Sequence, residues 1–149
     1  MKQRRRYGLV ILFLIILYGG AASAQPPAAR PTGELRVTIL GLKSSRGDVI
    51  FALYNSRRSF THDAYRTVFI PIVDRRCQWD AKGLPAGDYA VVVVHDRNGN
   101  HDMDSNFLGM PKEPYAFSNN ARALFGAPSF EAARLHVGTG LTAIQIRLK

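Results

Sequence analysis

The sequence predicts an all-β sandwich of about seven short strands with one long ordered loop. Apolar and polar residues alternate in short runs, as at Leu35, Val37 and Ile39, and this period of two is typical of strands. Turns rich in glycine and proline separate the runs, and neither an internal repeat nor a long helical pattern competes with them. These features together are the sequence profile of a β-sandwich.

Three of the predicted strands are indicated by specific features of their residues. Val49, Phe51 and Leu53 share one face of a run whose other face is also apolar, which indicates a central strand. Pro71 cannot donate to a sheet ladder, so its run belongs at an edge or a bulge. The β-branched run 90–94 follows a Pro/Gly turn and predicts a buried strand. The predicted strands are 35–39, 49–54, 68–72, 76–80, 90–94, 134–137 and 141–148.

The first 24 residues predict a secretory signal peptide. Basic residues at positions 2–6 precede an apolar run at 9–17, and Ala22-Ser23-Ala24 supplies a small-x-small cleavage pattern. The apolar run is shorter than the roughly 20 residues of a spanning helix, so we expect no transmembrane anchor after cleavage. A flexible Pro/Ala leader (25–33) and a single domain (34–149) would follow. Such a chain is exported, to the periplasm or beyond it.

Composition narrows the classes of partner. Four of the 20 Lys and Arg residues lie in the signal, which leaves 16 against 11 acidic residues. The pairs Arg57-Arg58 and Arg75-Arg76 are isolated, and no nucleic-acid motif is present, so we expect no nucleic-acid partner. Weak attraction to anionic envelope polymers or lipid head groups stays open. Cys77 is the only cysteine, which excludes an intrachain disulfide and favours a small buried side chain.

A dense acidic loop after the 90–94 run is the strongest candidate site. Oxygen-bearing side chains occupy alternate positions from 96 to 106, and calcium binds six to eight oxygen ligands. Counted from Asp96, the loop meets the helix–loop–helix calcium pattern at positions one, three, five and nine, and position seven adds a carboxylate. The predicted metal ligands are Asp96, Asn98, Asn100, Asp102 and Asp104.

The same loop departs from the calcium pattern. His101 stands at position six, where glycine allows the sharp turn, and Phe107 stands at position twelve in place of a bidentate glutamate. Glu113 could replace that glutamate only if the chain folded back. Asn98-Gly99 is also a favoured hairpin turn, so a metal-free Asx-rich turn is the alternative. Zinc or copper at His95 and His101 is less favoured than calcium. No cofactor is required.

The segment after this loop carries Phe107, Tyr115 and Phe117 between prolines. Either these aromatic side chains fasten the long connection to the sandwich as a small separate core, which we favour, or they line a ligand groove. In the second interpretation the predicted ligand surface consists of Tyr115, Ser118, Asn119 and Asn120.

Catalysis has little support in the sequence. The serines lack a nucleophile-elbow context, and no set of residues with named roles meets the requirements of an active site. We therefore expect a protein that is not an enzyme.

Motifs spread along the chain resemble an uncharacterised bacterial family. They are Gly41-Leu42 with Gly47, residues 84–90, His95-Asp96 with Asn98-Gly99-Asn100, residues 106–109, 111–113 and 117–121. On these motifs the chain from about 34 to 149 resembles domain-of-unknown-function family 2141. The resemblance implies a small exported protein with an immunoglobulin-like or transthyretin-like sandwich and no established activity. His101 stands where the family's glycine is expected.

The favoured function is an exported, non-catalytic binding module with a divalent-cation (calcium) loop. A purely structural or adhesive envelope protein without metal is the alternative, and a periplasmic hydrolase is less favoured. The expected partner is an envelope polymer or protein.

Overall fold

The computed structural model of the chain describes residues 31–107 and 111–148, so the predicted signal peptide and most of the predicted leader lie outside the described residues. The described part is almost entirely β-structure. Its elements are β1 (Thr32–Leu40), β2 (Asp48–Tyr54), β3 (Arg66–Pro71), β4 (Cys77–Pro85), β5 (Gly87–Asp96), β6 (Tyr115–Phe117), the 3₁₀ turn η1 (Ser118–Asn120), α1 (Phe130–Ala133), β7 (Leu135–Val137) and β8 (Leu141–Arg147).

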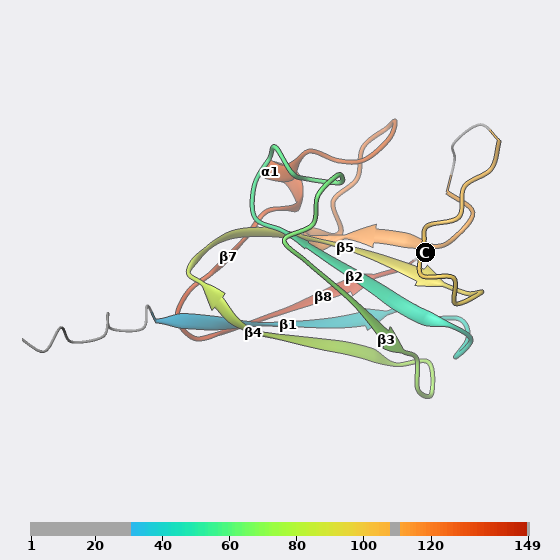
Figure 1. Cartoon of the computed structure of the whole chain (residues 1–149), viewed down its shortest axis with the longest axis horizontal. Helices are drawn as coiled ribbons and strands as arrows, with labels where there is room; N and C mark the ends of the chain where they lie inside the picture. Colours follow the sequence, from blue (N-terminus) through green and yellow to red (C-terminus); the bar gives the residue numbers. More distant parts are fainter. Residues whose placement is uncertain (1–30, 108–110, 149) are drawn as a thin grey trace, which may run out of the picture.

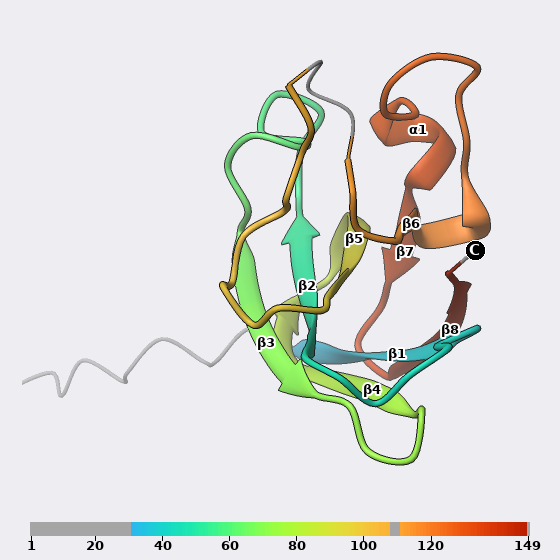
Figure 2. The same cartoon turned by 90° about the vertical axis from the view of Figure 1, so that its right-hand side faces the viewer.

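The eight strands form two sheets (Figure 1, Figure 2). One sheet has the order β4-β1-β8, in which β1 pairs antiparallel with β4 and parallel with β8. The other has the order β3-β2-β5-β6, and β7 pairs with the first residues of β5. The predicted all-β class is therefore confirmed, whereas the immunoglobulin-like or transthyretin-like subtype stays a prediction.

The main hydrophobic core fills the space between the two sheets. Phe51 on β2 and Trp79 on β4 meet across it with ring centroids 5.6 Å apart. Cys77 lies in the same core as a buried free thiol, as the sequence predicts. Burial, and secondarily the charge of Asp48, raise the pKa of this thiol to about 11.

The two strand placements predicted most specifically are confirmed. β2 lies between β3 and β5, with Val49, Phe51 and Leu53 all buried in the main core. β3 is an edge strand and ends at Pro71, so the residue without an N–H stands at the end of an edge strand, where proline is tolerated.

Two predicted boundaries differ from the structure at one corner. β1 begins at Thr32, inside the predicted leader, and β4 continues to Pro85 instead of ending at residue 80. The two extensions pair with each other, because Gly33 faces Leu84 next to a register shift that the strand alternation does not reveal. Tyr89 then fixes the corner, since its hydroxyl donates to the carbonyl of Pro85 at 2.8 Å.

A second, smaller core covers the outer face of the five-stranded sheet. The Phe60 ring lies at its centre, with centroids 5.4 Å from Tyr54, 5.8 Å from Phe130 and 6.1 Å from Phe117. Residues 55–65 and α1 contribute to this core and bring separate parts of the chain together over β5. Two loops and a short helix therefore stand on one side of the sandwich (Figure 1).

The long ordered loop that the sequence predicts contains a short strand that was not predicted. β6 lies within it and pairs with β5, so that Phe117 faces Val92 and Tyr115 faces Val94. A strand of three residues is too short to show an alternating pattern. Phe117 is buried and fastens the connection as predicted, whereas Phe107 is 95% exposed and fastens nothing.

Candidate functional site

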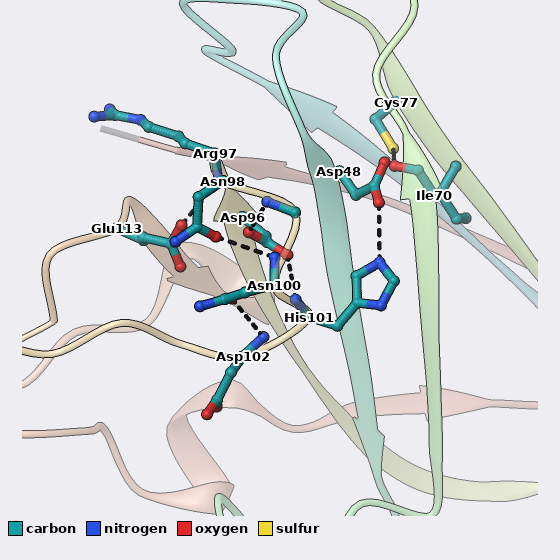
Figure 3. Close-up of polar contacts among 11 residues, drawn as sticks. Asp48, Ile70, Cys77, Asp96, Arg97, Asn98, Asn100, His101, Asp102 and Glu113 are labelled. Carbon is teal, nitrogen blue, oxygen red and sulfur yellow. Dashed lines mark hydrogen bonds and ion pairs between the residues drawn. The ribbon is translucent and has the colours of Figure 1, made fainter.

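The acidic loop begins at Asp96, the last residue of β5, whose side chain is completely buried. Its two carboxylate oxygens each accept one backbone N–H, from Gly99 and from His101, both at 2.8 Å (Figure 3). Gly47 makes this close packing possible, because a Cβ atom there would lie 1.8 Å from the carbonyl oxygen of Asp96. Asp96 therefore acts as the internal anchor of the loop.

Amide side chains organise the exposed part of the loop. The Asp104 carboxylate accepts the side-chain amides of Asn98 at 2.8 Å and Asn100 at 3.1 Å. The side-chain oxygen of Asn98 accepts the N–H of Asn100, and that of Asn100 accepts the N–H of Asp102. These are successive Asx turns, in which each side chain bonds the backbone two residues on.

Glu113 closes the loop from its far end. The chain folds back, so that this buried carboxylate accepts the N–H of Arg97 at 2.8 Å and that of Asp104 at 3.4 Å. The sequence raised Glu113 only as a replacement for the glutamate of a calcium loop. In the structure it fastens the two ends of the loop to each other.

His101 makes the sharp turn that the calcium pattern assigns to glycine. Its φ of 62° lies in the left-handed region, which costs a non-glycine residue about 1–2 kcal/mol. Two contacts offset that strain. The imidazole stacks on Phe69 with ring centroids 4.3 Å apart, and its Nε2 lies 3.3 Å from a carboxylate oxygen of Asp48.

The hydrogen bonds that the loop carboxylates already accept affect how well a cation fits this loop. The carboxylates of Asp96, Asp104 and Glu113 accept hydrogen bonds from the loop itself, and one Asp102 oxygen accepts the N–H of Met103. In the part of the chain that the structure describes, no three His, Cys, Asp or Glu side chains are grouped to hold a metal ion. A calcium ion would have to displace the Asn98 and Asn100 amides from Asp104. The calcium site stays a prediction.

The predicted ligand surface divides into buried and accessible residues. Ser118 is buried, where its hydroxyl accepts the N–H of Val91 at 2.9 Å and donates to the carbonyl of Ala133. Asn119 is exposed, and its side-chain amide donates to the carbonyl of Arg134 at 2.7 Å. Both side chains therefore join η1 to neighbouring elements.

Tyr115 and Asn120 instead line a hollow of about 280 Å³ beside β6. Its charged residues, Arg122 and Arg147, come from separate parts of the chain. Asn120 is held at the wall because its side-chain oxygen accepts the N–H of Arg147 at 2.9 Å. Neither arginine stood out in the sequence, since each is a single basic residue far from the other. The remaining walls are Ala116, Phe117, Ala121, Ala123, Gly126 and Pro128.

The chain can be compared with known proteins on this basis. Residues 37–145 match the model of a family described as "Uncharacterized protein conserved in bacteria (DUF2141)". The chain belongs to this family. The predicted resemblance is thus confirmed, and DUF2141 brings no established activity with it. No curated protein and no solved structure matches the chain at a significant level. Within residues 31–107 and 111–148, no helix is both long and apolar enough to cross a membrane.

Proposed function

We propose that this DUF2141 protein is an exported, non-catalytic binding module whose ligand site is the hollow lined by Tyr115, Asn120, Arg122 and Arg147. The observation that carries the proposal is that two arginines from separate parts of the chain line one hollow. Among the described residues neither guanidinium has an acidic partner, so both charges are available to a ligand. Arginine binds carboxylate and phosphate groups in a bidentate manner, which favours an anionic ligand.

The state of the nucleophilic and basic side chains supports a non-catalytic role. The Ser118 hydroxyl is used inside the fold, and Nε2 of the buried His95 lies 2.9 Å from the carbonyl oxygen of Arg46. The Cys77 thiol has a pKa of about 11, so little of it is thiolate near neutral pH. Each of these groups is committed to packing or to a backbone contact.

The acidic loop enters the proposal as a brace that keeps its shape without a cation. Its carboxylates are satisfied by backbone N–H groups and by Asn98 and Asn100, so like charges are separated by donors. Calcium binding is the competing possibility. Thermal melting in chelator and then in millimolar calcium separates the two, because a cation bound only by the folded state raises the melting temperature.

Titration calorimetry with inorganic phosphate and malonate, and with neutral glycerol as a third probe, tests the binding site. We expect saturable binding of at least one anion and none of glycerol. Arg122→Gln and Arg147→Gln should each weaken anion binding roughly tenfold, because a hydrogen bond to a charged group is worth about 1.5–3 kcal/mol.

Arg58→Gln is the matched control, since Arg58 is also exposed but does not line the hollow. If neither anion binds saturably, the proposed binding site is wrong. An equal loss of anion affinity in Arg58→Gln would show that the effect comes from the net charge of the protein and not from the hollow.

A further inference from the structure

We propose that the tip of residues 121–128 is a membrane-docking surface that binds anionic lipid bilayers. Leu124 and Phe125 are consecutive and 96% and 93% exposed, and Phe107 is 95% exposed. Single exposed apolar residues are common on protein surfaces, but an adjacent Leu–Phe pair with almost no protein contact leaves a large apolar area in water. Insertion of these side chains into the apolar part of a bilayer would remove the free-energy cost of exposing them to water.

The exposed apolar residues lie on the same side of the molecule. Figures 1 and 2 both show residues 55–65, 103–107 and 121–129 rising from the five-stranded sheet, away from β1 and β4. A cavity of about 330 Å³ is lined by Met103 and Pro111 from one segment and by Gly126 and Ala127 from the other, which places the two segments side by side. Phe107 and the Leu124–Phe125 pair can therefore meet one surface together.

The charge on this side suits an anionic surface. Segments 55–65, 103–107 and 121–129 contain three basic and two acidic residues, and 121–128 itself contains Arg122 and no acidic residue. A basic side chain close to an anionic bilayer is attracted to the negative surface. The basic residues are Arg57, Arg58 and Arg122, of which Arg57 is already paired with Glu131, and the acidic residues are Asp63 and Asp104.

The shape of the surface favours a bilayer over a folded protein partner. A stable protein interface buries about 800 Å² on each partner in a continuous, complementary patch. Here the apolar side chains stand on separate loop ends with a cavity between them. A bilayer interface deforms around such separate projections, and large apolar side chains enter it beneath the head groups.

Vesicle co-sedimentation tests the inference on protein purified from cells that express the full chain, so that its N-terminus is naturally processed. Vesicles are phosphatidylcholine alone or an equal mixture with phosphatidylglycerol. We expect binding to the mixed vesicles only. Leu124→Ser combined with Phe125→Ser should weaken partitioning by about tenfold or more, since burying each side chain is worth roughly 1.5–3 kcal/mol.

Val73→Ser is the matched control. Val73 is 66% exposed and is followed by Asp74, Arg75 and Arg76, but it lies in the turn between β3 and β4, away from the loop ends. Its substitution should leave partitioning unchanged. Absence of binding to mixed vesicles, an unaffected double variant, or an equal loss in Val73→Ser would each overturn the inference. Self-association that the double variant abolishes would also overturn it, because a second copy would then cover the tip.

The anion hollow supplies an internal check. The double variant at 124 and 125 leaves Tyr115, Asn120, Arg122 and Arg147 in place, so it should bind phosphate or malonate like the unmodified protein. Failure of membrane docking is thus distinguishable from failure of the proposed ligand site.

Discussion

Replacing Asp96 by Asn should destabilise the fold far more than the same change at Asp104. Asp96 is 0% exposed and accepts two backbone N–H groups at 2.8 Å, so its carboxylate is a buried acceptor pair. Asn keeps one acceptor oxygen but turns an NH₂ group toward the second N–H. The loss of one charge-assisted hydrogen bond costs about 1.5–3 kcal/mol, and the unsatisfied buried donor adds about 1–3 kcal/mol.

The expected decrease in the free energy of unfolding is therefore about 3–5 kcal/mol, a large fraction of a typical total of about 5–15 kcal/mol. Asp104 accepts only exposed amide groups, so Asp104→Asn should cost about 1 kcal/mol or less. Urea unfolding at equilibrium measures both values, with the m-value showing whether unfolding stays two-state.

Equal losses in the two variants would refute the role of Asp96 as an anchor. A loss below about 1 kcal/mol in Asp96→Asn would do the same, because it would mean that the two N–H groups find other acceptors. The prediction also affects metal experiments. A calcium response that disappears in Asp96→Ala would be ambiguous, since that variant loses the loop anchor. Asp102→Asn and Asp104→Asn are the informative variants.

Three further predictions follow from the same region and from the core. Gly47 and Gly99 both have φ of +72°, but a Cβ at Gly47 meets the Asp96 carbonyl oxygen at 1.8 Å whereas a Cβ at Gly99 meets nothing within 4 Å. In urea unfolding Gly99→Ala should cost about 1–2 kcal/mol and Gly47→Ala clearly more, and equal costs would contradict the packing. His101→Ala should lower the melting temperature more than His101→Gly, because alanine loses the stacking on Phe69 and keeps the left-handed strain; the reverse order would show that the strain is negligible. The native Cys77 thiol should resist iodoacetamide at pH 8 and react once urea unfolds the protein. The pKa of this thiol is raised from 9.0 to about 11 in the folded protein, so the unfolded thiol ionises first as pH rises. The free energy of unfolding should therefore decrease between pH 9 and pH 11, and it should decrease less in the Cys77→Ala variant.

Local patterns predicted the parts of the fold that depend on local chemistry. The two-sided apolar run around Phe51 and the proline at residue 71 placed a central strand and an edge strand correctly. β6 was missed because three residues carry no periodicity, and its position depends on pairing with Val92 and Val94 of β5. The extension of β4 was missed because it depends on Gly33, a residue assigned to the leader.

The candidate site was predictable only in part, for a physical reason. Alternating Asp and Asn residues encode both calcium ligands and Asx turns, because the same oxygens that bind a cation also accept backbone N–H groups. Sequence alone cannot decide which donor each oxygen meets. The structure shows N–H donors at Asp96 and Glu113, and it places Arg122 and Arg147 together although nothing in their local sequence links them.

The most direct test of the central claim is a map of backbone and side-chain amide shifts by NMR as phosphate or malonate is added. The account predicts saturable shifts at Tyr115, Asn120, Arg122 and Arg147, with the acidic loop at 96–104 unchanged. Shifts centred on residues 96–104 that appear with calcium, together with an unresponsive hollow, would contradict it. That result would make the acidic loop the functional site.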